Sequence, residues 1–229
     1  VKGETFRPTE RIKVYVLEVK DTPKGPRVSV SRTHPDLVKR LFESEVAEVR
    51  DGTVEIKAIA REAGSRTKIA VKSNDANVDP VGACVGLNGA RVNAIVSELR
   101  GEKIDIINWD DNPAYLIENA LSPAKVICVV ADEEEREAQV IVPDYQLSLA
   151  IGKEGQNARL AARLTGFKID IKSETQAREM GLFEQMGLQY GDTPAPSFEE
   201  DSFEEDSYEE TENYPEYEEG YQEDGNGQE

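Results

Sequence analysis

The chain of 229 residues is acidic overall, with 46 Asp and Glu against 27 Lys and Arg, but its charge is unevenly distributed. Residues 191–229 contain 16 acidic residues and no Lys or Arg, so residues 1–190 carry 30 acidic against 27 basic side chains. The near-neutral part can therefore hold a local basic groove. The two cysteines, Cys84 and Cys128, exclude a disulfide framework and a cysteine metal site, and they indicate a reducing compartment.

No segment has the composition of a membrane span or a secretory leader. The longest unbroken apolar run, residues 126–131, is far shorter than the roughly 20 residues that a spanning helix needs. No charged and then apolar leader opens the chain. We therefore expect a cytoplasmic protein that does not enter a membrane.

Residues 1–33 have the pattern of a β-hairpin. Ile12, Val14 and Val16 alternate with charged or polar neighbours over residues 11–19, a Pro-Lys-Gly-Pro turn follows, and a second strand is expected at residues 27–31. A lone two-stranded hairpin is marginal in water. We interpret this segment as the end of a β-barrel domain whose earlier strands are absent.

A repeat organises the rest of the chain. The segment LRGEKIDI at residues 99–106 recurs as LTGFKIDI at residues 164–171, and VGLNG at residues 85–89 pairs with IGKEG at residues 151–155. The first offset is 65 residues and the second is 66. Two copies of one unit are therefore present.

Each copy predicts the same order of elements, α-β-β-α-α-β, which is an α+β fold with three helices on one three-stranded sheet. In both copies a Gly-x-x-Gly segment joins the second and third helices. The first copy predicts these elements: helix 35–49, strands 53–63 and 67–73, a short helix from residue 80, a helix carrying Val92, Ile95, Val96 and Leu99, and strand 103–107. The second predicts these: helix 113–121, strands 125–131 and 138–142, helices 144–151 and 156–164, and strand 168–172.

This order, with Gly-x-x-Gly between two helices, resembles the KH RNA-binding module in its bacterial arrangement. Residues 78–86, running on to 103–109, are similar to the first KH module of the NusA family of bacterial transcription factors, and residues 147–157 are similar to its second. Residues 1–33 resemble the end of the OB-type RNA-binding barrel of that family. The resemblance implies four domains: the end of the barrel at 1–33, KH domains at 34–109 and 110–190, and an acidic tail at 191–229.

The resemblance also implies a function and partners. Proteins of this family bind single-stranded nascent RNA, RNA polymerase and other transcription factors, and act in pausing, termination and antitermination. The family's polymerase-binding domain and most of the barrel have no counterpart in this chain. We expect a monomer that carries the RNA-binding half of that task and uses no cofactor.

The two Gly-x-x-Gly loops are the candidate phosphate sites. Paired glycines let the backbone approach a ligand closely, and the next helix presents unpaired N–H groups and the positive end of its dipole. KH loops clamp about four nucleotides in this way. The candidate RNA-binding residues of the first copy are Gly86, Leu87, Asn88, Gly89, Arg91, Arg100 and Lys103. Those of the second are Gly152, Lys153, Glu154, Gly155, Gln156, Arg159, Arg163, Lys168 and Lys172.

Simpler interpretations remain open for several of these residues. The arginines and lysines outside the loops could be ordinary solvated faces of a helix or strand. His34 is interpreted as a helix cap or a hinge residue, Trp109 as a packing residue at the junction of the modules, and both cysteines as core residues. The short connection at residues 108–112 predicts two modules held side by side.

Catalysis has no support in the sequence, which lacks a P-loop, a dinucleotide fingerprint and Cys/His metal spacing. We therefore expect a binding protein and not an enzyme. Two alternatives are the RNA-binding end of an exoribonuclease and a ribosome-associated KH protein.

The acidic tail contains a five-residue repeat over residues 197–211, and its composition predicts disorder. It is either a solubilising extension or a competitor of RNA for the KH grooves.

Overall fold

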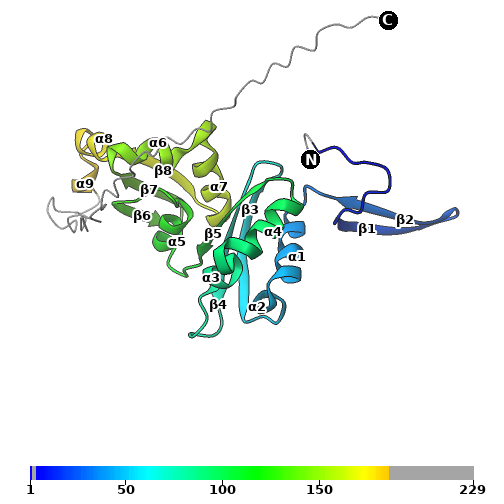
Figure 1. Cartoon of the computed structure of the whole chain (residues 1–229). Helices are drawn as coiled ribbons and strands as arrows, with labels where there is room; N and C mark the ends of the chain where they lie inside the picture. Colours follow the sequence, from blue (N-terminus) through cyan, green and yellow to red (C-terminus); the bar gives the residue numbers. More distant parts are fainter. Residues whose placement is uncertain (2–3, 186–229) are drawn as a thin grey trace, which may run out of the picture. The chain divides into compact units, whose positions relative to one another are not determined.

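The computed structural model describes residue 1 and residues 4–185 (Figure 1). The predictions for the tail at residues 191–229, and for the last five residues of the second expected KH domain, lie outside the described residues. Two mixed three-stranded sheets with their helices follow a β-hairpin, which confirms the α+β fold. No helix in the described part of the chain is long and apolar enough to cross a membrane.

The hairpin consists of β1 (Tyr15–Thr22) and β2 (Gly25–Ser31), paired antiparallel. Its first strand begins and ends later than the expected 11–19. Val16, Val19, Val28 and Val30 are all at least half exposed. An ion pair from Arg32 to Glu98 links the base of the hairpin to the first module, and a second pair links Arg32 to Glu4 of the segment before β1.

The first module consists of α1 (Pro35–Glu45), α2 (Ala47–Arg50), β3 (Val54–Glu62), β4 (Arg66–Ser73), α3 (Pro80–Val85), α4 (Ala90–Glu98) and β5 (Lys103–Asn108). The sheet order is β3-β4-β5, with β3 and β4 antiparallel and β4 and β5 parallel. The His34 ring caps α1, because its Nδ1 accepts a hydrogen bond from the Asp36 N–H at 3.1 Å, which confirms the prediction for this residue.

The prediction of one helix over residues 35–49 is wrong at Val46. This residue takes extended dihedral angles, φ −114° and ψ 111°, and its side chain is fully buried. A β-branched residue is a weak helix former, and the extended backbone places its side chain among the core residues. Core packing therefore overrides the helical continuation, and a separate helix, α2, starts at the next residue.

The second module repeats the first. It consists of α5 (Pro113–Ala120), β6 (Cys128–Asp132), β7 (Glu137–Val142), α6 (Leu147–Ile151), α7 (Gln156–Thr165) and β8 (Lys168–Ser173), with sheet order β6-β7-β8. Two differences from the predictions stand out. The strand expected from residue 125 begins only at Cys128, and the helix expected over residues 144–151 is a 3-10 turn followed by α6.

Two short helices that the repeat did not predict follow the second module, α8 (Glu174–Glu179) and α9 (Leu182–Gln185). Ala177 and Leu182 from these helices pack on Ile141 of β7. They cover the face of the second sheet that points away from α5, α6 and α7. Cys128 is partly buried against the same cluster, and its thiol is free, as is that of the buried Cys84.

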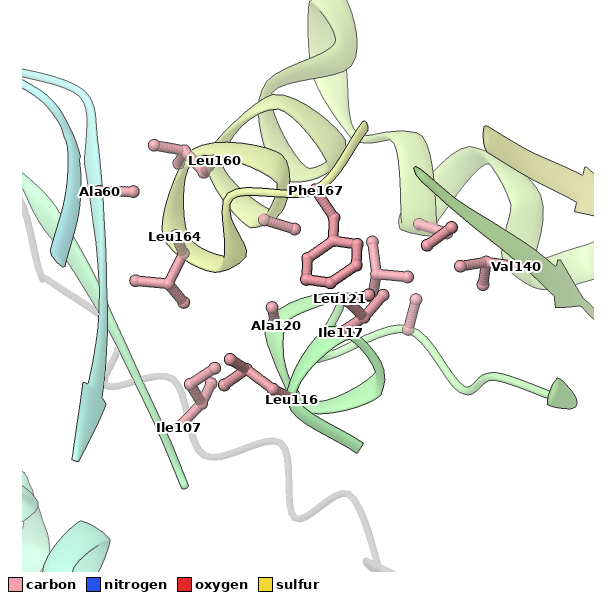
Figure 2. Packing of buried hydrophobic residues seen from close by; sticks show 14 of the residues in the cluster. Ala60, Ile107, Leu116, Ile117, Ala120, Leu121, Val140, Leu160, Leu164 and Phe167 are labelled. Atoms are coloured by element: carbon pink, nitrogen blue, oxygen red, sulfur yellow. The ribbon is translucent and has the colours of Figure 1, made fainter. Parts of the chain in front are cut away.

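The first sheet is covered on both faces, once by its own helices and once by the second module. Ile69 and Val71 of β4 point toward α1 and α4, while Ala60, Ala70 and Ile107 join the core of the second module. Figure 2 shows Ala60 beside Leu160 and Leu164 of α7, and Ile107 beside Leu116 of α5. Trp109 packs against this shared cluster, which confirms its interpretation as a junction residue. Full burial of one large apolar side chain, relative to its exposure to water, stabilises the folded chain by about 1.5–3 kcal/mol.

A buried lysine adds a polar link between the modules. Lys68 of β4 is fully buried, and its ammonium donates to the Ser122 carbonyl oxygen of the second module at 2.8 Å. Its charge is balanced by the Asp105 carboxylate at 3.1 Å. Burial lowers the pKa of Lys68, and the attraction of Asp105 opposes that effect. The Asp105 carboxylate and the Ser122 carbonyl oxygen thus offset the cost of burying the Lys68 ammonium away from water.

Candidate nucleic-acid interface

The two Gly-x-x-Gly loops have the same backbone, although their middle residues differ. Gly86 and Gly152 have φ of 74° and 76°, and their ψ values are 173° and 171°. The third residues, Asn88 and Glu154, are left-handed, with φ of 51° and 53°. A single fold has therefore produced two nearly identical loop conformations from two sequences.

The first glycine of each loop cannot be replaced without a rearrangement. A Cβ on Gly86 would lie 2.7 Å from Cγ of Arg91, and a Cβ on Gly152 would lie 2.8 Å from the backbone nitrogen of Asn157. The positive φ is a second reason for glycine at both positions. Packing within the chain therefore requires glycine at both positions, and the close approach of these loops to a ligand stays a prediction.

The helix after each loop leaves its first N–H groups without a side-chain cap. Gly89 and Gly155 are the N-cap residues of α4 and α7, and neither helix start has a side-chain hydrogen bond. Uncapped N–H groups and the helix dipole favour an anionic ligand at this end. The first N–H groups, those of Ala90 and Gln156, donate to the carbonyl oxygens of Leu87 and Lys153. The helix starts after the loops are therefore candidate anion sites, and phosphate binding there stays a prediction.

Each loop is fastened to the preceding helix by the fifth residue after its first glycine. In the first module Arg91 donates to the Ala83 carbonyl oxygen at 2.7 Å and to the Glu48 carboxylate at 3.0 Å. In the second module the buried Asn157 donates to the carbonyl oxygens of Ala150 at 3.0 Å and Leu121 at 2.9 Å. Asn157 was not among the residues predicted from the sequence, although the 66-residue offset aligns it with Arg91.

The tips of the loops differ in chemistry. Leu87 is 85 % exposed, and Lys153 at the same place is exposed and has no ion pair with any residue that the structure describes. Tyr145, Leu149 and Ile151 are exposed apolar side chains on the segment that leads into the second loop. The second loop thus offers an available cation together with apolar surface.

The structure brings three of the predicted residues of the second module to a carboxylate of the first. Glu62, the last residue of β3, accepts from Arg159 Nε at 2.5 Å and Nη2 at 3.1 Å, and from Gln156 Nε2 at 2.9 Å. Arg163 Nη1 lies 3.4 Å from the same carboxylate. The Arg159 and Gln156 hydrogen bonds lower the pKa of Glu62 to about 2. These side chains therefore belong to the contact between the modules, and their assignment to RNA stays a prediction.

The other predicted cations do not gather at the loops. Arg100 follows the far end of α4, where it pairs with Glu10 at 2.5 Å and lies over the Phe6 ring. Strand alternation separates three lysines from the loop helices, because Ile104, Ile106, Ile169 and Ile171 occupy the helix-facing sides of β5 and β8. The lysines on the opposite sides are Lys103, Lys168 and Lys172. Lys168 pairs there with Glu137 at 2.8 Å, and Lys172 with Asp170 at 3.2 Å.

Comparison with known proteins agrees with this geometry. Residues 32–109 match the NusA-like first KH domain and residues 113–179 match the NusA-like second KH domain. Among curated relatives are the transcription termination/antitermination proteins NusA of Bacillus subtilis, 64% identical over 79% of this chain and 49% of that protein, and of Halalkalibacterium halodurans, 62% identical over 80% and 48%. That of Mycobacterium tuberculosis is 58% identical over 76% and 50%.

The chain spans about half the length of these relatives. Both KH matches occur in the order that the family resemblance implies, and each contains one of the two loops. The chain belongs to the NusA family through its two tandem KH domains.

Proposed function

We propose that the two KH domains bind one single strand of RNA, with a Gly-x-x-Gly loop on the backbone phosphates at each of two places. The chain is the RNA-binding half of a transcription termination and antitermination factor, and it works by binding and not by catalysis. It acts as a monomer, because one chain carries both loops.

The observation that carries this proposal is the pair of matching loops, each followed by an uncapped helix start. One such loop is a common turn, but two with φ values within a few degrees, in modules that share a core, support the proposal of a repeated phosphate site. If each loop holds about four nucleotides, the two together need a strand of about eight or more.

The relatives support the wider role. Their names describe termination and antitermination of transcription, and this chain matches them over both KH domains. Contacts with RNA polymerase and other transcription factors are part of the proposal, and so is the nascent transcript as the natural RNA. An exoribonuclease end or a ribosome-associated protein is less favoured, because both KH matches are to NusA-like domains.

The experiment compares binding of the whole chain to a labelled single-stranded RNA, the matching RNA duplex and single-stranded DNA. A double-loop variant carries Leu87→Asp, Asn88→Asp, Lys153→Asp and Glu154→Asp. A control variant, Lys39→Glu on the exposed side of α1, matches the charge change of one loop. We expect binding to single-stranded RNA that the double-loop variant loses and the control keeps. Undiminished binding by the double-loop variant, with the fold intact by circular dichroism, would end this proposal.

A further inference from the structure

The second loop is connected through Arg159 to a residue of the first module. Arg159 of α7 donates through Nη1 to the backbone carbonyl oxygen of Glu154, inside the loop, at 3.0 Å. Its other guanidinium nitrogens donate to the Glu62 carboxylate of β3. Arg159 therefore connects the strand end of one module with the loop backbone of the other.

Gln156 makes a parallel connection. It is the first residue of α7, directly after the loop, and its side-chain amide donates to Glu62 at 2.9 Å and to Ser65 Oγ at 2.7 Å. Both receiving residues flank the β3–β4 turn of the first module. The start of the helix that follows the second loop is thus also anchored across the interface.

The loop conformation explains why this support matters. Glu154 has a left-handed backbone, which is unfavourable for most residues other than glycine, asparagine and aspartate. The first loop has Asn88 at the same place, a residue that tolerates this conformation well. The residue equivalent to Arg159 in the first module is Asn93, which carries no charge. Only the loop with the less suitable residue has an arginine on the carbonyl of that residue.

We infer that Glu62 is a positioning residue for RNA binding by the second loop, acting through Arg159 and Gln156 without touching the RNA itself. The inference rests on the proposed RNA function and adds to it a coupling between the two modules. The Glu62 side chain is 19% exposed and holds three donors from α7, so it is built into the contact. From its negative charge alone, Glu62 would be expected to weaken RNA binding at the nearby loop.

The test depends on the sign of the effect. A carboxylate near an RNA site repels phosphate, so removing its charge should by itself raise RNA affinity. If Glu62 positions the loop, Glu62→Gln lowers the affinity of the whole chain for a single-stranded RNA of about twelve nucleotides by about fivefold to tenfold. The matched control is Glu55→Gln on the same strand, where an exposed carboxylate pairs only with Lys57 among the described residues. An affinity that is unchanged or raised relative to this control would overturn the inference.

Arg159 supplies a second, independent variant. Arg159→Lys keeps the charge but loses the forked contact that spans Glu62 and the Glu154 carbonyl. The inference predicts that it weakens RNA binding as much as Glu62→Gln does, and that the double variant is no weaker than either single one. If Arg159 instead served RNA as a simple charge, lysine would preserve binding and the effects of the two variants would add.

A measurement without RNA keeps the inference testable apart from the proposed function. In Glu62→Gln the amide resonances of residues 153–155 should shift, while those of residues 86–89 stay unchanged. Unchanged resonances at the second loop would contradict the inference. The loop variant with Lys153→Asp and Glu154→Asp, measured in the same binding assay, separates the two levels. If it binds RNA normally, the RNA function fails; if it loses binding and Glu62→Gln does not, only the positioning role fails.

Discussion

The two KH domains share a backbone but differ in how their loops are charged and supported. The first loop, with Leu87 and Asn88 at its tip, is fastened within its own module by Arg91. The second, with Lys153 and Glu154, is fastened by Asn157 within its module and by Arg159 to Glu62 of the other. Duplication of a fold thus preserves loop geometry, while a few flanking residues differ, and we expect these to make the second loop the stronger phosphate site and the one that depends on its neighbour.

The same contrast occurs where the last strand of each module begins. Glu102 before β5 is buried, with two hydrogen bonds from Arg61 at 2.8 and 2.9 Å. Phe167 takes this place before β8, and Arg136 lies 4.9 Å over its ring. Equivalent positions therefore hold an ion pair in one module and a cation on an aromatic ring in the other.

The largest expected effect is the loss of the buried ion pair. Burial raises the pKa of Glu102, but hydrogen bonds from Arg61, Thr67 and the Gly64 N–H outweigh it and bring the pKa below its usual range. Glu102→Ala leaves Arg61 buried and unpaired, so the free energy of unfolding should fall by about 3–5 kcal/mol. Urea denaturation measures it. The exposed ion pair of Glu137 is the comparison, where alanine should cost about 0–1 kcal/mol. Equal losses of unfolding free energy in the Glu102 and Glu137 variants would contradict the claim that the buried ion pair matters more than the exposed one.

Replacing the loop tips one at a time should expose their difference in phosphate binding. Lys153→Asp with Glu154→Asp removes a cation and adds repulsion, and should weaken RNA binding by about 100-fold, or about 2.7 kcal/mol. Leu87→Asp with Asn88→Asp adds only repulsion and should cost about tenfold, or about 1.4 kcal/mol. Fluorescence anisotropy at one salt concentration gives both values. A larger loss at the first loop would reverse the ranking of the two sites.

Giving the first loop the missing charge should make the two sites more alike. Leu87→Lys introduces a cation at a fully solvated tip, where it costs little stability, and should raise RNA affinity by about threefold to tenfold at low salt. If about five phosphates are neutralised in the natural chain, log K falls with log salt with a slope near −3.5, and the variant should add about −0.7. An unchanged slope would show that the lysine does not reach a phosphate.

The smallest effect is the pH dependence of the link between the modules. The pKa of Glu62 is lowered to about 2 by Arg159 and Gln156, with Arg163 also facing the carboxylate. A lowered pKa means that the carboxylate stabilises the fold fully above its ordinary pKa of 4.5 and loses this contribution as pH falls toward 2. The difference in unfolding free energy between the natural chain and Glu62→Gln should therefore be constant near neutral pH and shrink below pH 4.5. If this difference in unfolding free energy persists unchanged to pH 2, it does not arise from the charge of the Glu62 carboxylate.

The sequence predicted the parts of this molecule that repeat. Both loops, both sheets and the helix order follow from the 65- and 66-residue offsets, and His34 and Trp109 were interpreted correctly from their places at a helix start and a junction. The break at Val46 was missed because helical periodicity continues through it, and core packing, which sets its backbone, is not visible in a local pattern.

Contacts between residues that are far apart in the chain could not be predicted from the sequence. Arg159 and Glu62 are 97 residues apart, so nothing local marks them as partners. The helices α8 and α9 lie outside the repeat and could not be inferred from it. The sequence indicates that Lys168 and Lys172 lie on the opposite side of their strand from Ile169 and Ile171. Only the structure shows that the isoleucines are on the side that faces the loop helices.

The central claim is that one RNA strand spans both loops, and its most direct test is the dependence of affinity on RNA length. Single-stranded RNAs of one sequence from about four to about twelve nucleotides are titrated against the natural chain and the two single-loop variants. Affinity of the natural chain should rise steeply up to about eight nucleotides and then level off, and either loop variant should lose that rise. Equal affinity for the shortest and longest RNAs in the natural chain would contradict the claim.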